Sequence, residues 1–562
     1  MTTSTRLRPA TAEHSDPPLV VTHDRPPAQR ASRRAGRPGR ALRWVVAHRA
    51  SIAILVPVLA VVAVVHATGM ADAPQRADDE GTYASQAWAI LHLNTLAHYT
   101  YWYDHPPLGW ILAALYAAAT GAFSRAPNAV AAGREFLLVL QVVSSALLYV
   151  LARRLELRRW TAAGAVVLFA LSPLAVMFHR AVFLDNIATP FLLAAFVLAL
   201  SPARRLAAHA ASGLCFGIAV LCKETSLLLL PALVWQLWQM TDRKTRPYSF
   251  AVAGSFLVLS GSFYVLFAAL RGELLPGPGH VSLFDGIAFQ LVTRDGGGSA
   301  LDPSSGSRQT IASWLWWDQW LLLAGLAVLP LGLLIRRMRP LAAGLAILVL
   351  MSLRPGYLPI PFVIGLLPLA ALVVAMVTDA VWGPDASAGR LRPVAGIRRV
   401  AQGTWRVARR ATVVTVVVAA VGFVGPDWYQ MDRDLMTVDH DRPLTQAQRW
   451  IDDNVPSDSP ILVDDAIWVD LVRSGRPASR VVWFWKLDRD PEIRARYPDG
   501  WRNFEYVVST IAVRLSLEQL PEISAAMEHG TVVASFGEGG DQVQVLRVSD
   551  PRRDPAAGRA RP

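Results

Sequence analysis

The sequence predicts an all-α polytopic membrane domain followed by a small C-terminal α/β domain. Hydrophobic residues make up 53% of the 562 residues and charged residues 17%, whereas soluble proteins carry about 25% charged residues. Apolar runs of bilayer length recur from Ser51 to Val424, and shorter apolar runs separated by turn residues follow them. We therefore expect a basic disordered cytoplasmic tail at 1–45, a transmembrane domain at 46–426, an extracytoplasmic domain at 443–549 and a disordered tail at 550–562.

Eleven apolar segments predict membrane-spanning helices. Arginine clusters lie between alternate pairs of segments, and such clusters mark cytoplasmic loops. This pattern places the N-terminus inside and the C-terminal domain outside a plasma membrane. Leu108–Phe123 is also apolar, but a crossing there would reverse the orientation, so we expect an interfacial or re-entrant helix. The eleven segments are 50–68, 135–152, 160–178, 187–201, 210–223, 225–240, 248–270, 314–335, 341–353, 358–382 and 411–425.

The net charge of +12 is unevenly distributed along the chain. Residues 1–49 contain ten arginines and three acidic residues, whereas residues 427–562 contain 17 basic and 23 acidic residues. A nucleic-acid-binding protein needs a basic face on a folded domain, and the C-terminal domain is acidic, so no nucleic-acid partner is expected. The two cysteines exclude a disulfide scaffold.

The C-terminal domain has the pattern of a small α/β fold. The stretch LTQAQRWIDDNV predicts a helix with Thr445 near its N-cap. Strands are predicted at ILVDDA, VVWFWK, FEYVVST and the pair TVVASF and QVQVLRV. With this orientation, four stretches lie outside, at 69–107, 179–186, 271–313 and 427–562.

The first outer stretch contains the acidic triplet Asp78-Asp79-Glu80. Acidic triplets are commonly solvated loops. Here the apolar spacing of TYASQAWAILHL, which includes Tyr83, puts the acids at a helix N-terminus, where the helix dipole stabilises ionised carboxylates. An ionised carboxylate can accept the proton of a hydroxyl acceptor.

Two further outer segments hold polar and aromatic residues. Trp102 stands in the run YWYDHPPLG, before His105, and this run fits either an interfacial aromatic belt or a stacking platform for a sugar. Arg180 and Asp185 share a very short loop. They fit either a local ion pair or a site in which arginine contacts phosphate and aspartate positions a sugar.

Two interruptions of the apolar runs are also candidates. Lys223-Glu224 separates two half-length runs, and ionisable residues in such places are commonly functional. The pair is either a self-satisfied turn or a source of counter-charge for a lipid phosphate. Arg354, three residues before Tyr357, is either a snorkelling arginine or a second phosphate or sugar contact.

The sequence contains no nucleotide-binding or hydrolase motif of the Walker A, GxGxxG, HExxH or GxSxG type. A sugar transferase with its polar groups at the outer face needs a donor that is available outside. Nucleotide sugars are made in the cytoplasm, so a lipid-phosphate sugar is the donor that suits this arrangement.

At these residues the chain resembles the polytopic GT-C glycosyltransferases, and among them the protein O-mannosyltransferases of glycosyltransferase family 39 and the aminoarabinose transferases. The resemblance covers about residues 45–425, and no trefoil-type insert of the eukaryotic mannosyltransferases is present. The last motif departs from the family's Arg-Tyr-Leu-Pro by two inserted residues. The matching residues are Asp79-Glu80, His105-Pro106-Pro107-Leu108, Arg180 with Asp185, Lys223, and Arg354 with Tyr357-Leu358-Pro359.

The resemblance implies inverting transfer of a sugar from a polyprenyl-phosphate donor to an acceptor hydroxyl at the outer membrane face. Asp79 would be the general base, supported by Glu80, and Lys223 with Arg180 or His105 would neutralise the leaving phosphate. The acceptor class stays open between lipid, glycan and protein. No spacing demands a metal, although a divalent cation near Asp79, Glu80 and Asp185 is compatible with the motif. Residues expected to contact the sugar or lipid are Tyr83, Trp102, Tyr103 and Tyr357.

Two other functions remain open on the sequence. A transporter or lipid-linked sugar flippase would also use charges within the membrane, but it predicts repeat symmetry between halves, which the sequence does not show. A membrane-anchored sensor would use the 443–549 domain to bind a ligand, but it would not need eleven helices or the Asp79-Glu80 loop. The outward position of this domain and its tryptophans suggest that it recognises or gates the acceptor.

Overall fold

The computed structural model describes residues 40–549, except 77, 97–102, 202–204, 279, 295–296 and 384–396. The tail expected at 550–562 and most of the tail expected at 1–45 lie outside the described residues. The chain divides into two compact units, Met1–Ile52 and Ala53–Pro562. All the candidate residues belong to the second unit.

Helices occur at all eleven predicted apolar positions of the described chain. Six of the described helices are long and apolar enough to cross a bilayer, and α6 with α7, bent by 61°, would make a seventh. The crossings at α8, α9, α10 and α14 remain predictions, because these helices are shorter than a bilayer span. The helices are α1 (Arg40–Ala67), α2 (Asp78–His92), α3 (Leu108–Thr120), α4 (Ala122–Arg125), α5 (Ala129–Arg154), α6 (Arg159–Leu171), α7 (Pro173–Arg180), α8 (Leu184–Ala199), α9 (Leu206–Cys222), η1 (Glu224–Leu229), α10 (Leu230–Met240), α11 (Arg246–Leu270), α12 (Leu283–Ala288), η2 (Phe289–Thr293), α13 (Gly306–Leu334), α14 (Arg339–Leu353), η3 (Ile360–Phe362), α15 (Val363–Trp382) and α16 (Ile397–Thr437).

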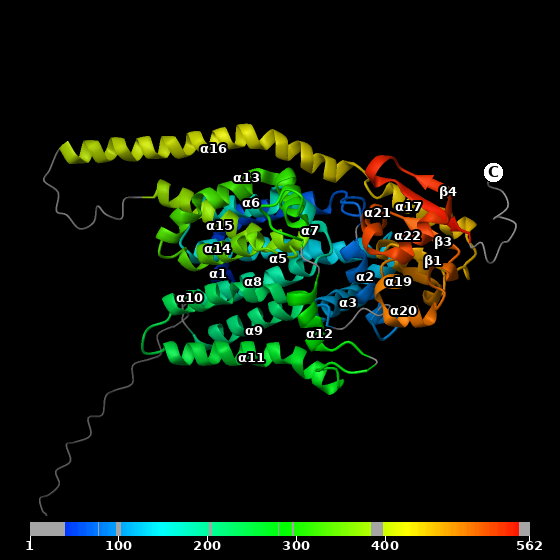
Figure 1. Ribbon diagram of the computed structural model, residues 1–562. Helices are drawn as coiled ribbons and strands as arrows, with labels where there is room; N and C mark the ends of the chain where they lie inside the picture. Colours follow the sequence, from blue (N-terminus) through cyan, green and yellow to red (C-terminus); the bar gives the residue numbers. More distant parts are fainter. Residues whose placement is uncertain are drawn as a thin grey trace, which may run out of the picture. The chain divides into compact units, whose positions relative to one another are not determined.

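Helix α9 packs between α8 and α11, and small residues allow the close approach (Figure 1). A Cβ atom added to Gly213 would lie 2.0 Å from the carbonyl oxygen of Ala253 on α11. A Cβ atom added to Gly217 would lie 1.8 Å from Oγ of Ser260 on the same helix. Such backbone contact is how helices associate in lipid, where apolar side chains gain little from leaving the solvent.

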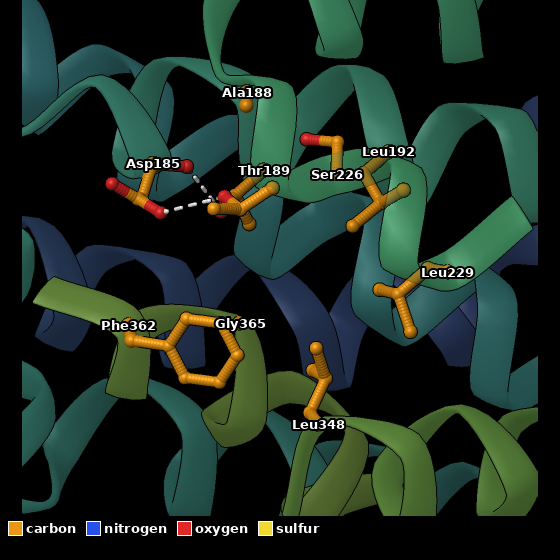
Figure 2. A pocket seen from close by; sticks show the side chains of 10 residues that line it. Asp185, Ala188, Thr189, Leu192, Ser226, Leu229, Leu348, Phe362 and Gly365 are labelled. Carbon is orange, nitrogen blue, oxygen red and sulfur yellow. Dashed lines mark hydrogen bonds between the residues drawn. The ribbon is translucent and has the colours of Figure 1, made fainter. Parts of the chain in front are cut away.

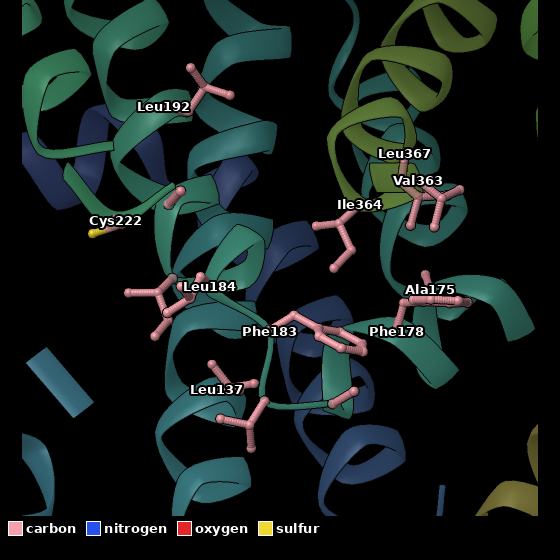
Figure 3. Close-up of a cluster of buried hydrophobic side chains, with 14 of the residues drawn as sticks. Leu137, Ala175, Phe178, Phe183, Leu184, Leu192, Cys222, Val363, Ile364 and Leu367 are labelled. Carbon is pink, nitrogen blue, oxygen red and sulfur yellow. The ribbon is translucent and has the colours of Figure 1, made fainter. Parts of the chain in front are cut away.

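The turn between α7 and α8 is anchored in the apolar core, so the polar residues beside it have fixed positions. Phe178 and Phe183 stack at a ring-centroid distance of 6.1 Å on either side of this turn. Figure 3 shows them between side chains of α5 and α15, including Leu137 and Ile364. This packing holds the start of α8, where Asp185 lies.

The C-terminal part forms one sheet within the described residues, with strand order β2-β1-β3-β5-β4. The strands of β2-β1-β3 are parallel, and β5 and β4 continue the sheet antiparallel. Each predicted strand is present, which confirms the α/β prediction for this region. The elements are α17 (Arg442–Asn454), β1 (Ile461–Val463), α18 (Asp465–Arg473), η5 (Ala478–Arg480), β2 (Val481–Trp483), α19 (Lys486–Arg489), α20 (Pro491–Arg496), η6 (Gly500–Asn503), β3 (Tyr506–Ser509), α21 (Ile511–Ser516), η7 (Leu517–Gln519), α22 (Pro521–Glu528), β4 (Gly530–Phe536), η8 (Gly539–Asp541) and β5 (Val543–Val548).

Helix α17 starts two residues before the predicted stretch LTQAQRWIDDNV. The residue that precedes it is Asp441, and Thr445, predicted near the N-cap, lies in the first turn. Pro443 explains the earlier start, because proline at the first helical positions needs no hydrogen-bond partner and already has a helical φ angle.

The predicted interfacial segment Leu108–Phe123 is helical at α3 and α4. Helix α3 packs against α2, α5, α8 and α9, and Gly121 ends it in the left-handed conformation that favours glycine. Its position at or within the membrane remains a prediction. Helix α2 packs on α3 and α5 and on α18 of the C-terminal domain, so it links the two parts of the second unit.

Candidate functional site

Four polar side chains from three separate segments meet beside the start of α8. They are His105 from the loop before α3, Asp185 from the first turn of α8, and Lys223 and Glu224 from the break between α9 and η1. Helix α9 ends at Cys222 because Lys223 adopts an extended backbone, with φ −152° and ψ 117°. We call this group the lysine cluster.

The lysine cluster has a defined hydrogen-bond direction. Lys223 Nζ lies 3.1 Å from His105 Nε2, and an ammonium group can only donate. His105 Nδ1 lies 3.2 Å from both carboxylate oxygens of Glu224. These partners assign a neutral imidazole that donates from Nδ1 to Glu224 and accepts from Lys223 at Nε2.

The ion pairs of the lysine cluster are long. Lys223 Nζ is 4.0 Å from Asp185 Oδ2 and 4.0 Å from Glu224 Oε1, which is beyond hydrogen-bond distance. Asp185 Oδ2 is buried and has no hydrogen-bond partner among the described residues. Lys223 therefore keeps donor capacity for a ligand, although nearby carboxylates balance its charge.

Asp185 of the lysine cluster also lines a pocket whose other residues are mostly apolar (Figure 2). One face of α8 supplies Asp185, Ala188, Thr189 and Leu192, at the spacing that one side of a helix presents. The opposite wall comes from η1, α14, η3 and α15. Its residues are Thr225, Ser226, Leu229, Leu348, Phe362 and Gly365. The polar residues Asp185, Thr189, Thr225 and Ser226 gather near the cluster, and the rest of the lining is apolar.

The acid pair Asp79-Glu80 at the start of α2 is divided between two environments. Glu80 is buried, and Arg134 of α5 donates to it from Nε (3.0 Å) and Nη2 (2.6 Å). The backbone N–H of Val182 also donates to Glu80, at 2.8 Å. Asp79 is half-buried and makes no hydrogen bond or ion pair with another described residue. Of the two carboxylates, Asp79 is the one with acceptor capacity left.

Tyr83 lies one helical turn after Asp79, and its ring is buried against the lysine cluster. The centroid of its ring is 6.0 Å from that of His105, in an edge-on arrangement, and 6.5 Å from that of Trp110. The ring of Tyr83 thus packs beside His105 of the lysine cluster, one helical turn away from Asp79.

Arg180 is not part of the lysine cluster. Its buried guanidinium donates to backbone carbonyl groups of α1, of the loop that follows α1, and of the end of α16. The acceptors are Val65, Thr68 (2.8 Å), Ala73 (3.4 Å) and Leu435 (2.6 Å). These contacts join the C-terminal ends of α1, α7 and α16, and they occupy donors that a phosphate ligand would need.

Arg354 and Tyr357 occupy a separate surface. Arg354 is exposed and donates to the carbonyl of Pro355 at 3.5 Å. The guanidinium of Arg294, from the loop after η2, stacks 3.6 Å from the ring centroid of Tyr357. Arg294 also donates to Gln290, which donates in turn to Asp104, the neighbour of His105. Of the two remaining predicted contacts, Tyr103 is buried and its hydroxyl donates to Glu273 at 2.6 Å, and Trp102 lies outside the described residues.

Within the described ranges, no group of three or more histidine, cysteine, aspartate or glutamate side chains is arranged to hold a metal ion. The trio Asp79, Glu80 and Asp185 does not share one coordination position, because Glu80 is held by Arg134 and Asp185 lies beside Lys223.

The sequence did not identify Arg134, the partner of Glu80. An arginine within the apolar run NAVAAGREFLL is the available signal, because a charged residue inside a hydrophobic helix needs a partner. The partner itself is 54 positions away, and nothing in the local sequence indicates it.

Part of the chain matches a known family. Residues 104–265 match the family model described as dolichyl-phosphate-mannose-protein mannosyltransferase. This range includes every member of the lysine cluster but not Asp79. None of the curated proteins compared by sequence matches the chain.

Solved structures of similar fold extend over most of the chain. ArnT from Cupriavidus metallidurans, bound to undecaprenyl phosphate, has a TM-score of 0.51 at 15% identity, over 88% of this chain and 98% of that one. The apo oligosaccharyltransferase of Archaeoglobus fulgidus has a TM-score of 0.52 at 13% identity, over 87% and 74% of the two chains. The same archaeal enzyme, AglB, in complex with an inhibitory peptide and a dolichol-phosphate, has a TM-score of 0.51 at 13% identity, again over 87% and 74%. These likenesses confirm the predicted GT-C-type fold over most of the chain.

Proposed function

We propose that the protein transfers a sugar from a polyprenyl-phosphate donor to an acceptor hydroxyl at the outer face of the plasma membrane. The observation that carries this proposal is that the lysine cluster lies beside a mostly apolar pocket, which Asp185 of the cluster lines. A lipid phosphate has the same two parts, an anionic head and a long apolar chain. The similarity to a protein bound to undecaprenyl phosphate and to a dolichol-phosphate complex supports the same donor class.

The donor phosphate would bind at Lys223. The ammonium group is held by His105 at 3.1 Å and keeps two further N–H groups. Its contacts with Asp185 and Glu224, both at 4.0 Å, leave room for a closer anion. The apolar chain would follow Leu192, Leu229 and Leu348 along the pocket, where burial gains about 0.8 kcal/mol for each methylene removed from water.

The reaction would be a single inverting displacement. The acceptor oxygen forms a bond to the anomeric carbon while the bond from that carbon to the phosphate oxygen breaks. The electron pair leaves with the polyprenyl phosphate, and the acceptor's proton passes to Asp79. Lys223 stabilises the charge that develops on the leaving group, an effect commonly worth a factor of about 10² to 10³ in kcat for one donor.

Glu80 would position Asp79 rather than take the proton itself. Its carboxylate accepts two hydrogen bonds from Arg134 and one from the backbone of Val182. This fixes the start of α2 against α5 and against the loop before α8. Asp79, with its acceptor capacity unspent, is the residue proposed as general base.

The acceptor and the membrane side follow from the predicted orientation. Arginine-rich loops in the cytoplasm put the lysine cluster, Asp79 and the C-terminal domain outside. The acceptor is then a hydroxyl on a lipid, glycan or protein of the cell envelope.

The direct test is sugar release from radiolabelled polyprenyl-phosphate sugars by purified protein. Mannose, glucose, arabinose and aminoarabinose donors are compared, with and without a divalent cation. We expect one donor to be turned over by the wild type and not by Asp79→Asn. Donor binding without turnover, together with movement of the donor across vesicle membranes, would instead support a flippase.

A further inference from the structure

The edge of the C-terminal sheet that faces α2 is the edge where α/β proteins usually bind ligands. The parallel strands β1, β2 and β3 end at Val463, Trp483 and Ser509, and ligand sites of open α/β sheets lie beyond such carboxyl ends. Here Asp465, the first residue of α18 and two positions after the end of β1, is fully buried. The edge is therefore occupied by another part of the same chain.

The occupant is the first turn of α2. Thr82 donates a short hydrogen bond to Oδ2 of Asp465, and both residues are buried. A Cβ atom added to Gly81 would lie 2.2 Å from the backbone nitrogen of Ala466 and 2.3 Å from the carbonyl carbon of Asp465. The two backbones are thus in direct contact where α2 meets α18.

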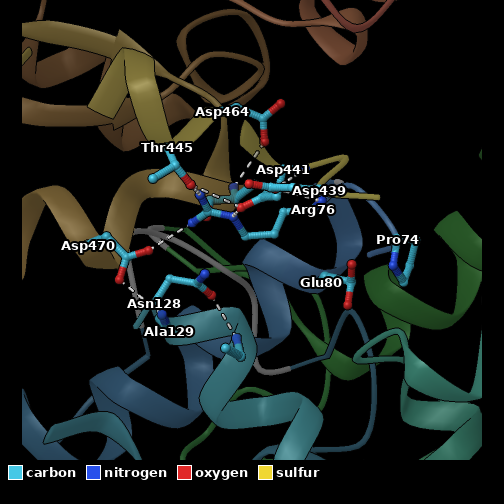
Figure 4. A network of polar contacts seen from close by, with 12 residues as sticks. Pro74, Arg76, Glu80, Asn128, Ala129, Asp439, Asp441, Thr445, Asp464 and Asp470 are labelled. Carbon is cyan, nitrogen blue, oxygen red and sulfur yellow. Dashed lines mark hydrogen bonds and ion pairs between the residues drawn. The ribbon is translucent and has the colours of Figure 1, made fainter. Parts of the chain in front are cut away.

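Two more contacts hold α18 in this place. Trp88 of α2 meets Trp468 of α18 edge to face at a ring-centroid distance of 5.9 Å. Asp470 of α18 accepts a hydrogen bond from the backbone N–H of Ala129, at the start of α5, at 2.9 Å. Arg76, just before α2, donates to Asp470 at 3.0 Å (Figure 4).

Arg76 also makes a 2.6 Å ion pair with Asp441, which precedes α17. Figure 4 shows Arg76 between Asp441 and Asp470, with Glu80 nearby on α2. Helix α18 therefore contacts both the start of α2 and the start of α5. The ion pair Glu80–Arg134 joins the same two helices. The N-terminal turn of α2 is fixed on both sides.

The contact between Thr82 and Asp465 lies within one helical turn of Asp79. Thr82 follows Asp79 by three positions, and residues three apart lie on neighbouring parts of a helix face. Loss of the contact between Thr82 and Asp465 would release the first turn of α2, which carries Asp79. Displacing a reacting group by about 1 Å commonly costs a factor of about 100 in rate.

We propose that Asp465, in the C-terminal domain, is a positioning residue of the active site that sets the place of Asp79 through Thr82. The proposal rests on the proposed function, in which Asp79 takes the acceptor's proton. It gives the C-terminal domain a role in catalysis that differs from acceptor recognition. The C-terminal domain is thereby part of the active site, because it supplies the residue that positions Asp79.

A double-mutant cycle tests the proposal in the full-length protein. The variants are Asp465→Asn, Thr82→Val and the double variant, with turnover normalised to the number of donor-binding sites so that the folded fraction does not enter. We expect kcat to fall about 10- to 100-fold in each single variant while the donor Kd stays within about twofold. The double variant should fall no further, because the two residues act as one unit. Thr82→Ser should restore most of kcat, since it keeps the hydroxyl.

The control is Glu505→Gln, which makes the same acid-to-amide change at the opposite, amino-terminal edge of β3, where Glu505 accepts a bond from Ser459. It should leave kcat unchanged. Wild-type kcat in Asp465→Asn, or losses that multiply in the double variant, would overturn the proposal.

A second readout separates this proposal from the proposed function. Amide hydrogen exchange over residues 79–83 should accelerate in Asp465→Asn and Thr82→Val and not in Glu505→Gln. If the wild type turned over no donor, the proposed function would fail, and exchange would still decide whether Asp465 fixes the start of α2. Unchanged exchange in both variants would contradict the positioning role.

Discussion

Two networks of charged residues lie near the start of α2 and differ in how tightly their ions are paired. In the first, Arg134 and Arg76 contact Glu80, Asp441 and Asp470 at 2.6 to 3.0 Å. In the second, Lys223 contacts its two carboxylates at 4.0 Å. We call the first network the arginine frame. Its charges are spent on contacts within the protein, whereas the lysine cluster keeps donors and acceptors unspent.

Burial alone does not distinguish a structural ion-pair network from a ligand site. Both networks bury charged groups, fully for Arg134 and Arg76 and only in part for the lysine cluster, where the Glu224 side chain is 37% exposed. Burial of charge is costly unless the groups are paired and hydrogen-bonded. The arginine frame meets that cost by short contacts and so is expected to matter for stability. The lysine cluster is incompletely paired, as a ligand site must be before its ligand arrives. Changes in the first network should alter folding, and changes in the second should alter binding and catalysis.

Breaking the arginine frame should have the largest effect on stability. Glu80→Gln leaves the buried guanidinium of Arg134 without its counter-charge, which commonly costs about 3 to 5 kcal/mol. Thermal unfolding in detergent should show a large fall in Tm. The matched control is Glu135→Gln, at the residue next to Arg134 on α5. This change removes the partner of the half-exposed Arg125 of α4 and should cost at most about 1 kcal/mol. Equal losses in the two variants would contradict the distinction.

Removing the charge of the lysine cluster should affect catalysis most. Lys223→Met keeps the length of the side chain but not its charge, and we expect kcat to fall about 10² to 10³-fold. The loss of Tm should be smaller than in Glu80→Gln, because the ion pairs of Lys223 are long. Lys244→Met, at an exposed lysine, serves as control and should behave as wild type. A Tm loss in Lys223→Met that equalled or exceeded that of Glu80→Gln would argue against a ligand site.

Separating α2 from α18 should lower both stability and activity. In Gly81→Ala the new methyl group would meet backbone atoms at 2.2 to 2.4 Å, and helix backbone atoms cannot move aside cheaply. We expect a cost of about 1 to 3 kcal/mol and a reduced kcat. Gly164→Ala in α6 is the matched change, because nothing lies within 4 Å of its added Cβ. That variant should be neutral or stabilised.

The stability of the C-terminal domain should depend on pH through Lys486. This lysine is fully buried over the ring of Trp483, at 4.2 Å, and desolvation lowers its pKa from 10.5 to about 7. Between these values the folded chain binds fewer protons than the unfolded chain, so stability should rise as the pH rises from about 7 toward 10. The carboxylates that face it and oppose the shift belong to Asp490, Asp465, Asp104 and Glu492.

The measurement is Tm against pH for the wild type and for Lys486→Met, which cannot titrate. Groups that do not interact with Lys486 titrate equally in both proteins, so the difference between the curves reports Lys486 and the carboxylates beside it, chiefly Asp490. The difference should change steadily over this range and level off below about pH 7. Parallel curves would show that Lys486 titrates normally.

The smallest effect is expected at the surface around Tyr357. Tyr357→Leu removes the stacking of Arg294, an interaction commonly worth about 0.5 to 2 kcal/mol. Because Arg294 leads through Gln290 to Asp104 beside the lysine cluster, the donor KM should rise a few-fold with little change in kcat. A fall in kcat with an unchanged KM would place Tyr357 closer to the reacting atoms than the structure does.

Local patterns were sufficient to predict the lysine cluster in part. Lys223 and Glu224 interrupt an apolar run, and His105 and Asp185 stand in motifs that resemble the family's, so each was identifiable by itself. Their meeting depends on contacts between residues 38 to 119 positions apart, which no local pattern contains. The helices and strands were predictable because their hydrophobic periodicity is contained in short stretches of sequence.

The acid pair Asp79-Glu80 is a clearer example of what local sequence patterns could not predict. Asp79 and Glu80 are adjacent and chemically alike, and the sequence alone gives them related roles. Only the position of Arg134 on α5 separates the spent carboxylate from the available one. Arg180 is a similar case, since the four carbonyls around it come from α1, the loop after α1, and α16.

The central claim is that the lysine cluster holds the phosphate of a lipid carrier and that Asp79 acts on the acceptor. It is tested most directly by measuring the affinity of purified protein for polyprenyl phosphate, the leaving group, in the wild type, Lys223→Met and Asp79→Asn. The account predicts that Lys223→Met binds at least about tenfold more weakly, the equivalent of one lost charge-assisted hydrogen bond, while Asp79→Asn binds as tightly as the wild type. Equal affinity in all three proteins, or a loss confined to Asp79→Asn, would contradict it.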